Sequence, residues 1–221
     1  APLSDTVNEF LQSVNIPIAY GYGLSETSAT VCFYPQVGFK FGSIGTIMPD
    51  VQVRIDPDNN EILVKGKTVM SGYYNKPEEN AKAFTEDGYL HTGDLGYMDE
   101  DGFVFFRGRA KRMIVTSGYN VYPAQIENIL DAHEYVQMSC VIGVPDSYKM
   151  QRVKAFVKLA AGVEASEETK QAILDHCRKH VAKYAMPSDV EFRDEMPKTL
   201  VGKVAYRVLE EEELEKMKHS A

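Results

Sequence analysis

The sequence predicts a mixed α+β fold whose pattern changes near residue 108. Between residues 45 and 107, apolar residues recur at every second position and are separated by glycine- and aspartate-rich turns, which is typical of a small β-rich subdomain. After residue 109, helical periodicity alternates with short apolar runs, which indicates an α/β domain. We therefore expect a first part over residues 1–44, a β-rich, barrel-like subdomain over 45–108 and a C-terminal α/β domain over 109–221.

The first part begins with an expected helix over residues 4–14. Ser4 or Asp5 can cap it, and its apolar side chains fall on one stripe, namely Val7, Phe10, Leu11 and Val14. A short strand is expected over residues 16–19. In the β-rich subdomain we expect strands over 51–55 and 62–64, a short helix over 78–84 and a hairpin over 95–107.

The C-terminal domain is expected to alternate strands and helices. Pro123 fits the first position of a helix over 123–132, and Glu167 and Glu168 fit the first turn of a helix over 166–184. The terminal helix spans 204–218, and its acidic run at 210–213 is expected to be a solvated face. The expected strands cover residues 113–115, 136–144, 152–159 and 190–192.

Composition limits the classes of function. The net charge of −8, with no lysine- or arginine-rich run, argues against a nucleic-acid-binding protein. No apolar run approaches the ~18 residues that a transmembrane helix needs. The three cysteines have no metal-ligand spacing, so we expect free thiols and a cytoplasmic protein; they are Cys32, Cys140 and Cys177.

The segment Gly21–Glu26 combines groups that can bind a nucleotide. Glycines on either side of Tyr22 allow a flat ligand to approach the backbone while the ring stacks on it, and these are Gly21 and Gly23. Ser25 and Glu26 then offer a hydroxyl for a phosphate oxygen and a carboxylate for a divalent cation. Taken alone, the same residues also fit a strand-to-helix turn with a buried tyrosine.

Two later segments carry comparable chemistry. Asp94, in His91-Thr92-Gly93-Asp94, can accept two hydrogen bonds from a ribose diol, although an isolated Thr-Gly-Asp also fits an Asx turn. Gly118, after Ser117, has no Cβ, so a narrow thiol arm can pass beside its backbone. A loop shaped only by glycine and proline is the alternative there.

Five motifs in this order resemble the latter half of an adenylate-forming enzyme. This superfamily includes acyl-CoA synthetases, the adenylation domains of peptide synthetases and firefly luciferase. The resemblance extends from Ala1 to about Leu209. The motifs are Tyr22–Glu26, His91–Asp94, Gly108–Lys111, Ser117–Pro123 and Pro197–Lys203.

The resemblance implies a role for each motif. Tyr22 would stack on adenine, and Ser25, where the family usually has threonine, would meet the α-phosphate of ATP. Glu26 would bind Mg²⁺, and Asp94 and Arg109 would contact the ribose.

The later motifs imply a lid that serves both half-reactions. Lys111 would be the hinge of this lid, and Ser117 and Gly118 would line a tunnel for the pantetheine arm of coenzyme A. Lys203 would offset the repulsion between a carboxylate and the α-phosphate. Tyr206 stands where the family often has arginine, which affects contacts after the lysine.

The function implied is that of an acyl-CoA synthetase acting on a carboxylate, with a fatty acid favoured because no carrier domain follows Lys203. The chain contains no Ser/Thr/Gly-rich phosphate loop, so we expect residues 1–44 to be the remnant of a large N-terminal domain and the chain alone to be inactive. The alternatives are a carrier-protein adenylation domain, a luciferase-like monooxygenase and a non-catalytic nucleotide- or partner-binding module. Retention of the polar motif residues argues against the last.

Overall fold

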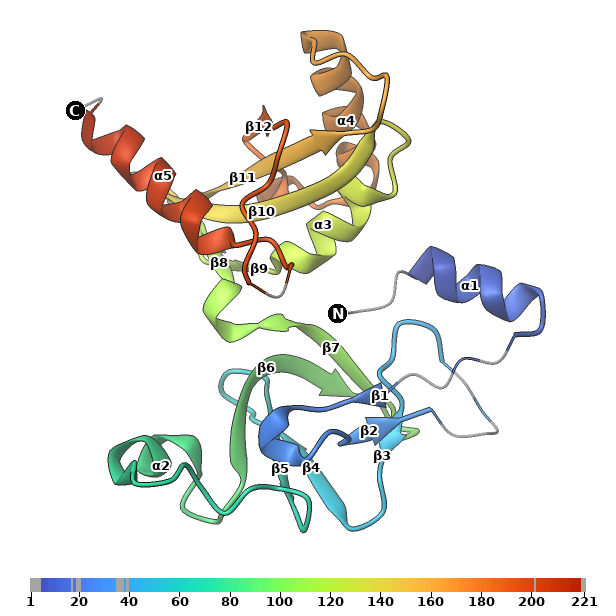
Figure 1. Ribbon diagram of the computed structural model, residues 1–221, viewed down its shortest axis with the longest axis vertical. Helices are drawn as coiled ribbons and strands as arrows, with labels where there is room; N and C mark the ends of the chain where they lie inside the picture. The colour runs from blue at the N-terminus through green and yellow to red at the C-terminus, as the bar shows by residue number, and fades with distance from the viewer. Residues whose placement is uncertain are drawn as a thin grey trace. The chain divides into compact units, whose positions relative to one another are not determined.

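A computed structural model describes residues 5–219, except positions 17, 19–20, 35–37, 39 and 201. The chain divides into two compact units, Ala1–Lys111 and Arg112–Ala221, each with its own strands and core (Figure 1). The expected mixed α/β fold is confirmed. The three-part division at residues 44 and 108 stays a prediction.

The first unit opens with helix α1 (Asp5–Ser13), followed by three two-residue strands, β1 (Gly21–Tyr22), β2 (Cys32–Phe33) and β3 (Thr46–Ile47). They form an antiparallel sheet in the order β1-β2-β3. Strands this short leave no periodic signal, so the sequence did not indicate them. Of the strand expected over 16–19, Ile16 and Ile18 lie outside any strand, and Pro17 and Ala19 lie outside the described residues.

A second antiparallel sheet in this unit contains β4 (Val51–Ile55), β5 (Glu61–Gly66), β6 (Leu90–Met98) and β7 (Val104–Arg109). It curls into a half-barrel, and its strands and its hairpin agree with the expected ones. Two register shifts interrupt its ladders, one between Glu61 and Leu63 and one between Leu95 and Gly96. Helix α2 (Pro77–Ala83) confirms the helix expected near residue 78.

The second unit contains one five-stranded sheet. Its strands are β8 (Ile114–Thr116), β9 (Tyr119–Val121), β10 (Val136–Asp146), β11 (Met150–Leu159) and β12 (Asp189–Phe192). They follow the order β10-β11-β8-β9, and β12 pairs in parallel with β11. Because β8 and β9 form a hairpin, the segment expected as a loop at residues 117–123 is partly strand.

Helices cover both faces of this sheet, because its two longest strands, β10 and β11, bury apolar side chains on each face. Val141, Ala155 and Val157 pack with α3 (Pro123–Asp131) and α4 (Glu167–His180). Their neighbours in sequence point to the opposite face, where Ile142 and Phe156 pack with α5 (Tyr206–His219). Figure 1 shows α3, α4 and α5 packed beside the β10–β11 pair.

One expectation about α5 is wrong. The acidic run at 210–213 is not a uniformly solvated face, because Glu213 is only 4% exposed. Its carboxylate lies 2.8 Å from the ammonium of Lys154, which is also buried. Amphipathic spacing turns one residue of the run inward, and a buried cation compensates its charge.

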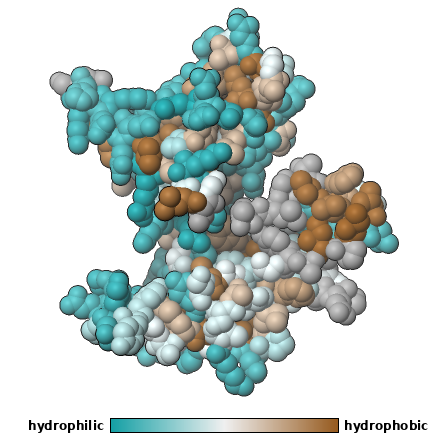
Figure 2. All heavy atoms as spheres, viewed as in Figure 1, coloured by the Kyte–Doolittle hydropathy of each residue, from teal (hydrophilic) through white to brown (hydrophobic). Residues whose placement is uncertain are grey.

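The surface of the first unit carries apolar side chains at its N-terminal end. Figure 2 shows them gathered over α1 and the turn after it, where Val7, Phe10 and Val14 are 45%, 62% and 49% exposed. All three cysteines are free and buried, and burial raises the pKa of Cys140 to about 12. Within the described part of the chain, no helix is long and apolar enough to span a bilayer.

Candidate active site

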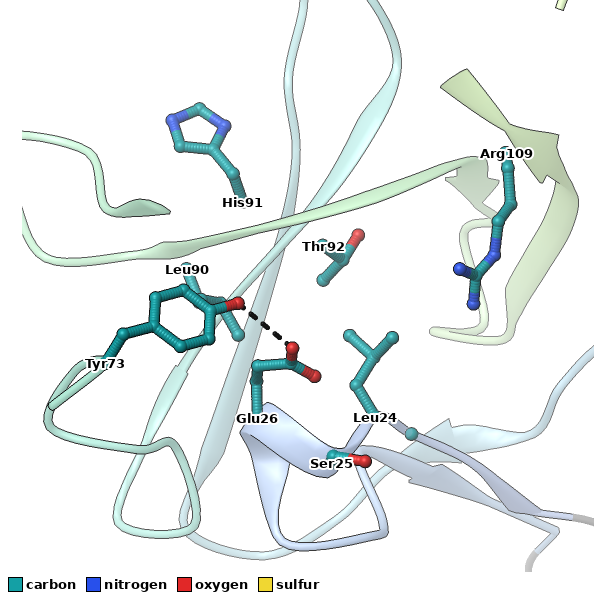
Figure 3. A pocket seen from close by; sticks show the side chains of 9 residues that line it. Leu24, Ser25, Glu26, Tyr73, Leu90, His91, Thr92 and Arg109 are labelled. Atoms are coloured by element: carbon teal, nitrogen blue, oxygen red, sulfur yellow. Dashed lines mark hydrogen bonds between the residues drawn. The ribbon is translucent and has the colours of Figure 1, made fainter. Parts of the chain in front are cut away.

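A pocket of about 400 Å³ lies within the first unit. It gathers side chains and backbone from four separate segments, which Figure 3 shows converging on one space. The first is the turn after β1, and the others are the segment before α2, strand β6 and the end of β7. The lining residues are Gly23, Leu24, Ser25, Glu26, Tyr73, Leu90, His91, Thr92 and Arg109.

The turn after β1 is tight and is held by a glycine and a buried threonine. A Cβ on Gly23 would lie 1.5 Å from the carbonyl oxygen of Ala29, so a side chain cannot fit there. Thr27 is fully buried, and its hydroxyl accepts a hydrogen bond from the Leu24 amide at 2.9 Å. Ser28 and Ala29 then adopt positive φ, which reverses the chain. This fold leaves Ser25 exposed and Glu26 facing the pocket.

Glu26 is held by the segment that precedes α2. The hydroxyl of Tyr73 donates a hydrogen bond to Glu26 Oε1 at 3.0 Å, drawn as the dashed line in Figure 3. The amide of Met70 also donates to the Glu26 carbonyl at 2.8 Å. Backbone and side chain of this glutamate are therefore fixed by the same short segment.

Asp94 is buried beside the pocket and joins two other motifs. Tyr22 donates its hydroxyl to Asp94 Oδ2 at 2.8 Å, and Arg109 Nε lies 3.2 Å from Oδ1. The contact with Arg109 lacks hydrogen-bond geometry, so Oδ1 accepts no hydrogen bond from the described residues. Among the described residues, Asp94 Oδ1 is thus a buried acceptor without a hydrogen-bond donor, next to the exposed guanidinium of Arg109.

The surroundings of Asp94 and Tyr22 raise the pKa of both side chains. Burial raises the pKa of the Asp94 carboxyl, which the hydrogen bond from Tyr22 partly opposes. Burial, reinforced by the Asp94 charge, raises the pKa of the Tyr22 hydroxyl. Tyr22 is therefore protonated at neutral pH, and its hydroxyl donates its hydrogen bond to Asp94.

A buried glutamate shapes the loop that carries Asp94. Glu61 accepts a hydrogen bond from the Gly93 amide at 2.7 Å through Oε1, and its Oε2 lies 2.9 Å from His91 Nδ1. Thr92 donates its hydroxyl to the Ile62 carbonyl at 2.6 Å and accepts from the Asp94 amide. These hydrogen bonds lie where the β5–β6 register shifts, between Glu61 and Leu63. Glu61 was not among the site residues expected from the sequence.

In the second unit, Ser117 and Gly118 form the turn of the β8–β9 hairpin, both with positive φ. The Ser117 amide donates to the Lys149 carbonyl at 2.9 Å, which fixes the turn. Apart from its two chain neighbours, no described residue has an atom within 4 Å of a Cβ added to Gly118, so the space beside its backbone is open.

Lys203 ends a tight loop that leads into α5. Lys198 and Val204 form a β-bridge, and the Thr199 amide donates to the Lys203 carbonyl at 2.7 Å. Thr199 also accepts from the Lys203 amide through its hydroxyl, and Gly202 has a φ of 79°. The loop leaves the Lys203 side chain exposed. Val201, within the same motif, lies outside the described residues.

The pocket offers limited but suitable ligands for a magnesium ion. Within the described residues, no cluster of three or more histidine, cysteine, aspartate or glutamate side chains could hold a metal. Glu26 supplies one carboxylate, whose Oε1 accepts from Tyr73. Mg²⁺ commonly binds through one or two carboxylates together with substrate phosphates and water, so this donor set fits it.

The structure brings together part of the expected site. Gly23, Ser25, Glu26 and Arg109 line the pocket, and Tyr22 and Asp94 contact its wall. Gly21 pairs with Phe33 in the sheet and does not line the pocket. Lys111, Ser117, Gly118 and Lys203 lie at or beyond the division between the units, and their roles stay predictions.

Tyr73 and Thr92 are lining residues that sequence reasoning missed. Thr92 stood within a recognised motif, so its hydroxyl was a usable signal. Tyr73 lies 47 residues from Glu26 in sequence, and nothing in its local pattern reveals that contact.

Comparison with known proteins gives two family matches. Residues 1–74 match the model described as AMP-binding enzyme, and residues 125–203 match the AMP-binding enzyme C-terminal domain. A long-chain-fatty-acid–CoA ligase of Bacillus subtilis is 46% identical over 206 residues, covering 88% of this chain and 36% of the relative. A 2-succinylbenzoate–CoA ligase of Bacillus cereus is 37% identical, covering 88% and 41%.

Solved structures agree with these matches. ATP-bound MatB from Rhodopseudomonas palustris superposes with a TM-score of 0.82 at 35% identity, covering 95% of this chain and 43% of that one. The o-succinylbenzoate CoA synthetase MenE from Bacillus subtilis, in complex with an acyl-adenylate intermediate, gives 0.84 at 28% identity, covering 95% and 44%. The chain therefore spans well under half the length of the relatives that it matches.

Proposed function

Because the chain belongs to the family of AMP-binding, adenylate-forming enzymes, we propose that the protein is an ATP-dependent acyl-CoA ligase that acts on a fatty acid. Its relatives named as ligases of long-chain fatty acids support this substrate class. The activity proposed is that of the full-length protein, to which this chain contributes the pocket and the candidate lysine.

One observation carries the proposal. The pocket places a hydroxyl, a carboxylate and a guanidinium around one space, from Ser25, Glu26 and Arg109. Asp94, whose buried Oδ1 accepts no hydrogen bond from the described residues, lies next to Arg109 and suits a ribose hydroxyl, and the ring of Tyr22 suits an adenine face. Together these groups match the parts of an adenosine nucleotide. Each is assigned to ATP by this chemistry and by the family.

In the first half-reaction, a carboxylate oxygen of the substrate attacks the α-phosphorus of ATP. The bond to the β-phosphate oxygen breaks, which gives acyl-AMP and pyrophosphate. Mg²⁺, when bound at Glu26, would neutralise charge on the phosphates. Ser25 would donate its hydroxyl to an α-phosphate oxygen. Lys203 would place an ammonium where the two anions approach and so stabilise the developing charge.

In the second half-reaction, the sulfur of coenzyme A attacks the acyl carbonyl and AMP leaves as the thiol loses its proton. We infer that the open face of Gly118 admits the pantetheine arm. Exchange of the Lys203 face for the Gly118 face would occur by rotation about Lys111. One lid would then serve both steps.

The direct test is an assay of the purified full-length protein with ATP, coenzyme A and carboxylic acids of increasing chain length. We expect equal amounts of AMP and acyl-CoA, with long-chain fatty acids turned over most efficiently. Failure to form either product with any carboxylate would refute a ligase function. AMP formation that requires a carrier protein in place of coenzyme A would show that the carrier protein is the thiol acceptor.

Replacement of Lys203 separates the half-reactions. Lys203→Ala in the full-length protein should lower the rate of acyl-adenylate formation by about 100-fold or more, because the transferring phosphoryl group loses a positioned charge. Thioester formation from supplied acyl-adenylate should be nearly unchanged. Lys198→Ala is the control, since it removes an exposed ammonium from the same loop. Equal losses in both half-reactions would contradict the assignment.

A further inference from the structure

Tyr73 has a place in the pocket that no motif assigned to it. Its hydroxyl donates to Glu26 Oε1, and its side chain lines the pocket (Figure 3). Tyr73 is 40% exposed and the next residue, Tyr74, is 90% exposed, so the two adjacent tyrosines face different surroundings. The chain therefore directs one phenol toward the glutamate and the other toward solvent.

Helix α2 holds the backbone of Tyr73 in place. Asn80 Oδ1 accepts from the Tyr73 amide at 2.7 Å, and Asn80 Nδ2 donates to the Tyr73 carbonyl at 3.0 Å. Gly72 precedes this pair with a φ of 141°, and a Cβ there would lie 3.0 Å from the Asn80 amide group. Asn80 thus hydrogen-bonds both the amide and the carbonyl of Tyr73, which fixes the backbone from which the phenol extends.

A tether of this kind changes the cost of binding a cation. A partly exposed glutamate samples several rotamers, and restricting such a side chain on binding costs conformational entropy. The bond from Tyr73 engages Oε1 only. It restricts the carboxylate before any ligand arrives, while the second oxygen keeps its full capacity as a ligand.

We propose that Tyr73 is a positioning residue that orients the Glu26 carboxylate for a divalent cation carried by the substrate's phosphates, with Asn80 as its anchor. The inference rests on the proposed function, because the cation is the one expected with ATP. Tyr73 acts through Glu26 and touches neither the cation nor the reacting atoms.

The test compares Tyr73→Phe with Tyr74→Phe in the full-length protein. For Tyr73→Phe we expect about a three- to tenfold increase in the Mg²⁺ concentration that gives half-maximal acyl-adenylate formation, with little change in rate at saturating Mg²⁺. Mn²⁺ titration with a non-hydrolysable ATP analogue, followed by electron paramagnetic resonance, should show the same weakening without turnover. Tyr74→Phe should match the wild type in both measurements.

Two further variants distinguish the possible failures. Glu26→Gln should weaken Mn²⁺ binding more than Tyr73→Phe, and Asn80→Ala should weaken it in the same direction. If Glu26→Gln weakens binding and Tyr73→Phe does not, the positioning role is refuted while the metal assignment stands. If Glu26→Gln leaves Mn²⁺ binding unchanged, the assignment of the cation to Glu26 fails. Equal melting temperatures of Tyr73→Phe and Tyr74→Phe exclude a folding defect.

Discussion

At the residue scale, Gly21 and Gly23 flank the same tyrosine but meet different surroundings. A Cβ on Gly21 would make ordinary contacts, the shortest being 3.6 Å to the Cys32 carbonyl. A Cβ on Gly23 would overlap the Ala29 carbonyl at 1.5 Å. The requirement for glycine at position 23 therefore comes from the protein's own turn, whereas the sequence had suggested close approach of a ligand at both positions.

This contrast predicts unequal effects of adding a methyl group. Gly23→Ala should lower the free energy of unfolding by about 2 kcal/mol or more, because the turn must open to admit the new Cβ. Gly21→Ala should change it by less than about 1 kcal/mol. Chemical denaturation followed by circular dichroism measures both. Equal stability of the two variants would show that the turn can relax without cost.

At the element scale, a buried ion network fastens α5 to the sheet of the second unit. Lys154 on β11 is 5% exposed and lies 2.7 Å from Glu191 on β12 and 2.8 Å from Glu213 on α5. Lys216 reaches the same two carboxylates. Burial opposes ionisation of these acids, but hydrogen bonds from Lys154 and Lys216, together with the charge of Arg193, outweigh it and lower the pKa of Glu191 to about 2.

Acid should therefore weaken the second unit in a defined range. Because the folded-state pKa of Glu191 is lowered, its contribution is complete above the ordinary glutamate pKa and is lost as pH falls from about 4.5 toward 2. The lowered pKa of Glu213 acts in the same direction. Lys154→Met should lower the free energy of unfolding by up to about 3 kcal/mol, because the buried carboxylate of Glu213 then keeps only Lys216 as its cation.

The measurement is urea denaturation at a series of pH values. The stability of Lys154→Met should vary less steeply with pH than that of the wild type between pH 4.5 and 2, since the pKa values of the two carboxylates would be lowered less, by Lys216 at both and by Arg193 at Glu191. Lys158→Met is the matched control on β11, because Lys158 forms no ion pair among the described residues. An unchanged slope in Lys154→Met would exclude this network as the source of acid sensitivity.

At the scale of the whole molecule, each unit has a core made from its own residues. The two hydrophobic clusters on either face of the β10–β11 pair are drawn entirely from residues after 112. The ion network that fastens α5 lies within the same unit. Among the described residues, these clusters and this network take no side chain from the first unit.

We therefore expect residues 112–221, produced alone, to fold as an autonomous domain. The expected result is a single cooperative thermal transition, with dispersed amide resonances in a nitrogen–proton correlation spectrum. Non-cooperative melting together with collapsed resonances would show that the unit needs the preceding residues. The Lys154→Met form of the same segment should melt at a lower temperature than the Lys158→Met form.

The sequence by itself determined the secondary structure of most long elements and the chemistry of the motifs. Helices α3 and α4 and the β6–β7 hairpin were predictable because caps, turns and periodicity act over a few residues. Ser25 and Glu26 were recognised as site candidates for the same reason, since they stand together in one short motif.

Only the tertiary structure decided which distant groups meet. The bonds from Tyr22 to Asp94 and from Tyr73 to Glu26 join residues 72 and 47 positions apart. The burial of Glu213 depends on Lys154, which lies on another element. Such contacts depend on how strands register and how helices pack, and no local pattern encodes them. The sequence thus determined which groups are present, and the tertiary fold decided their partners, their burial and their pKa values.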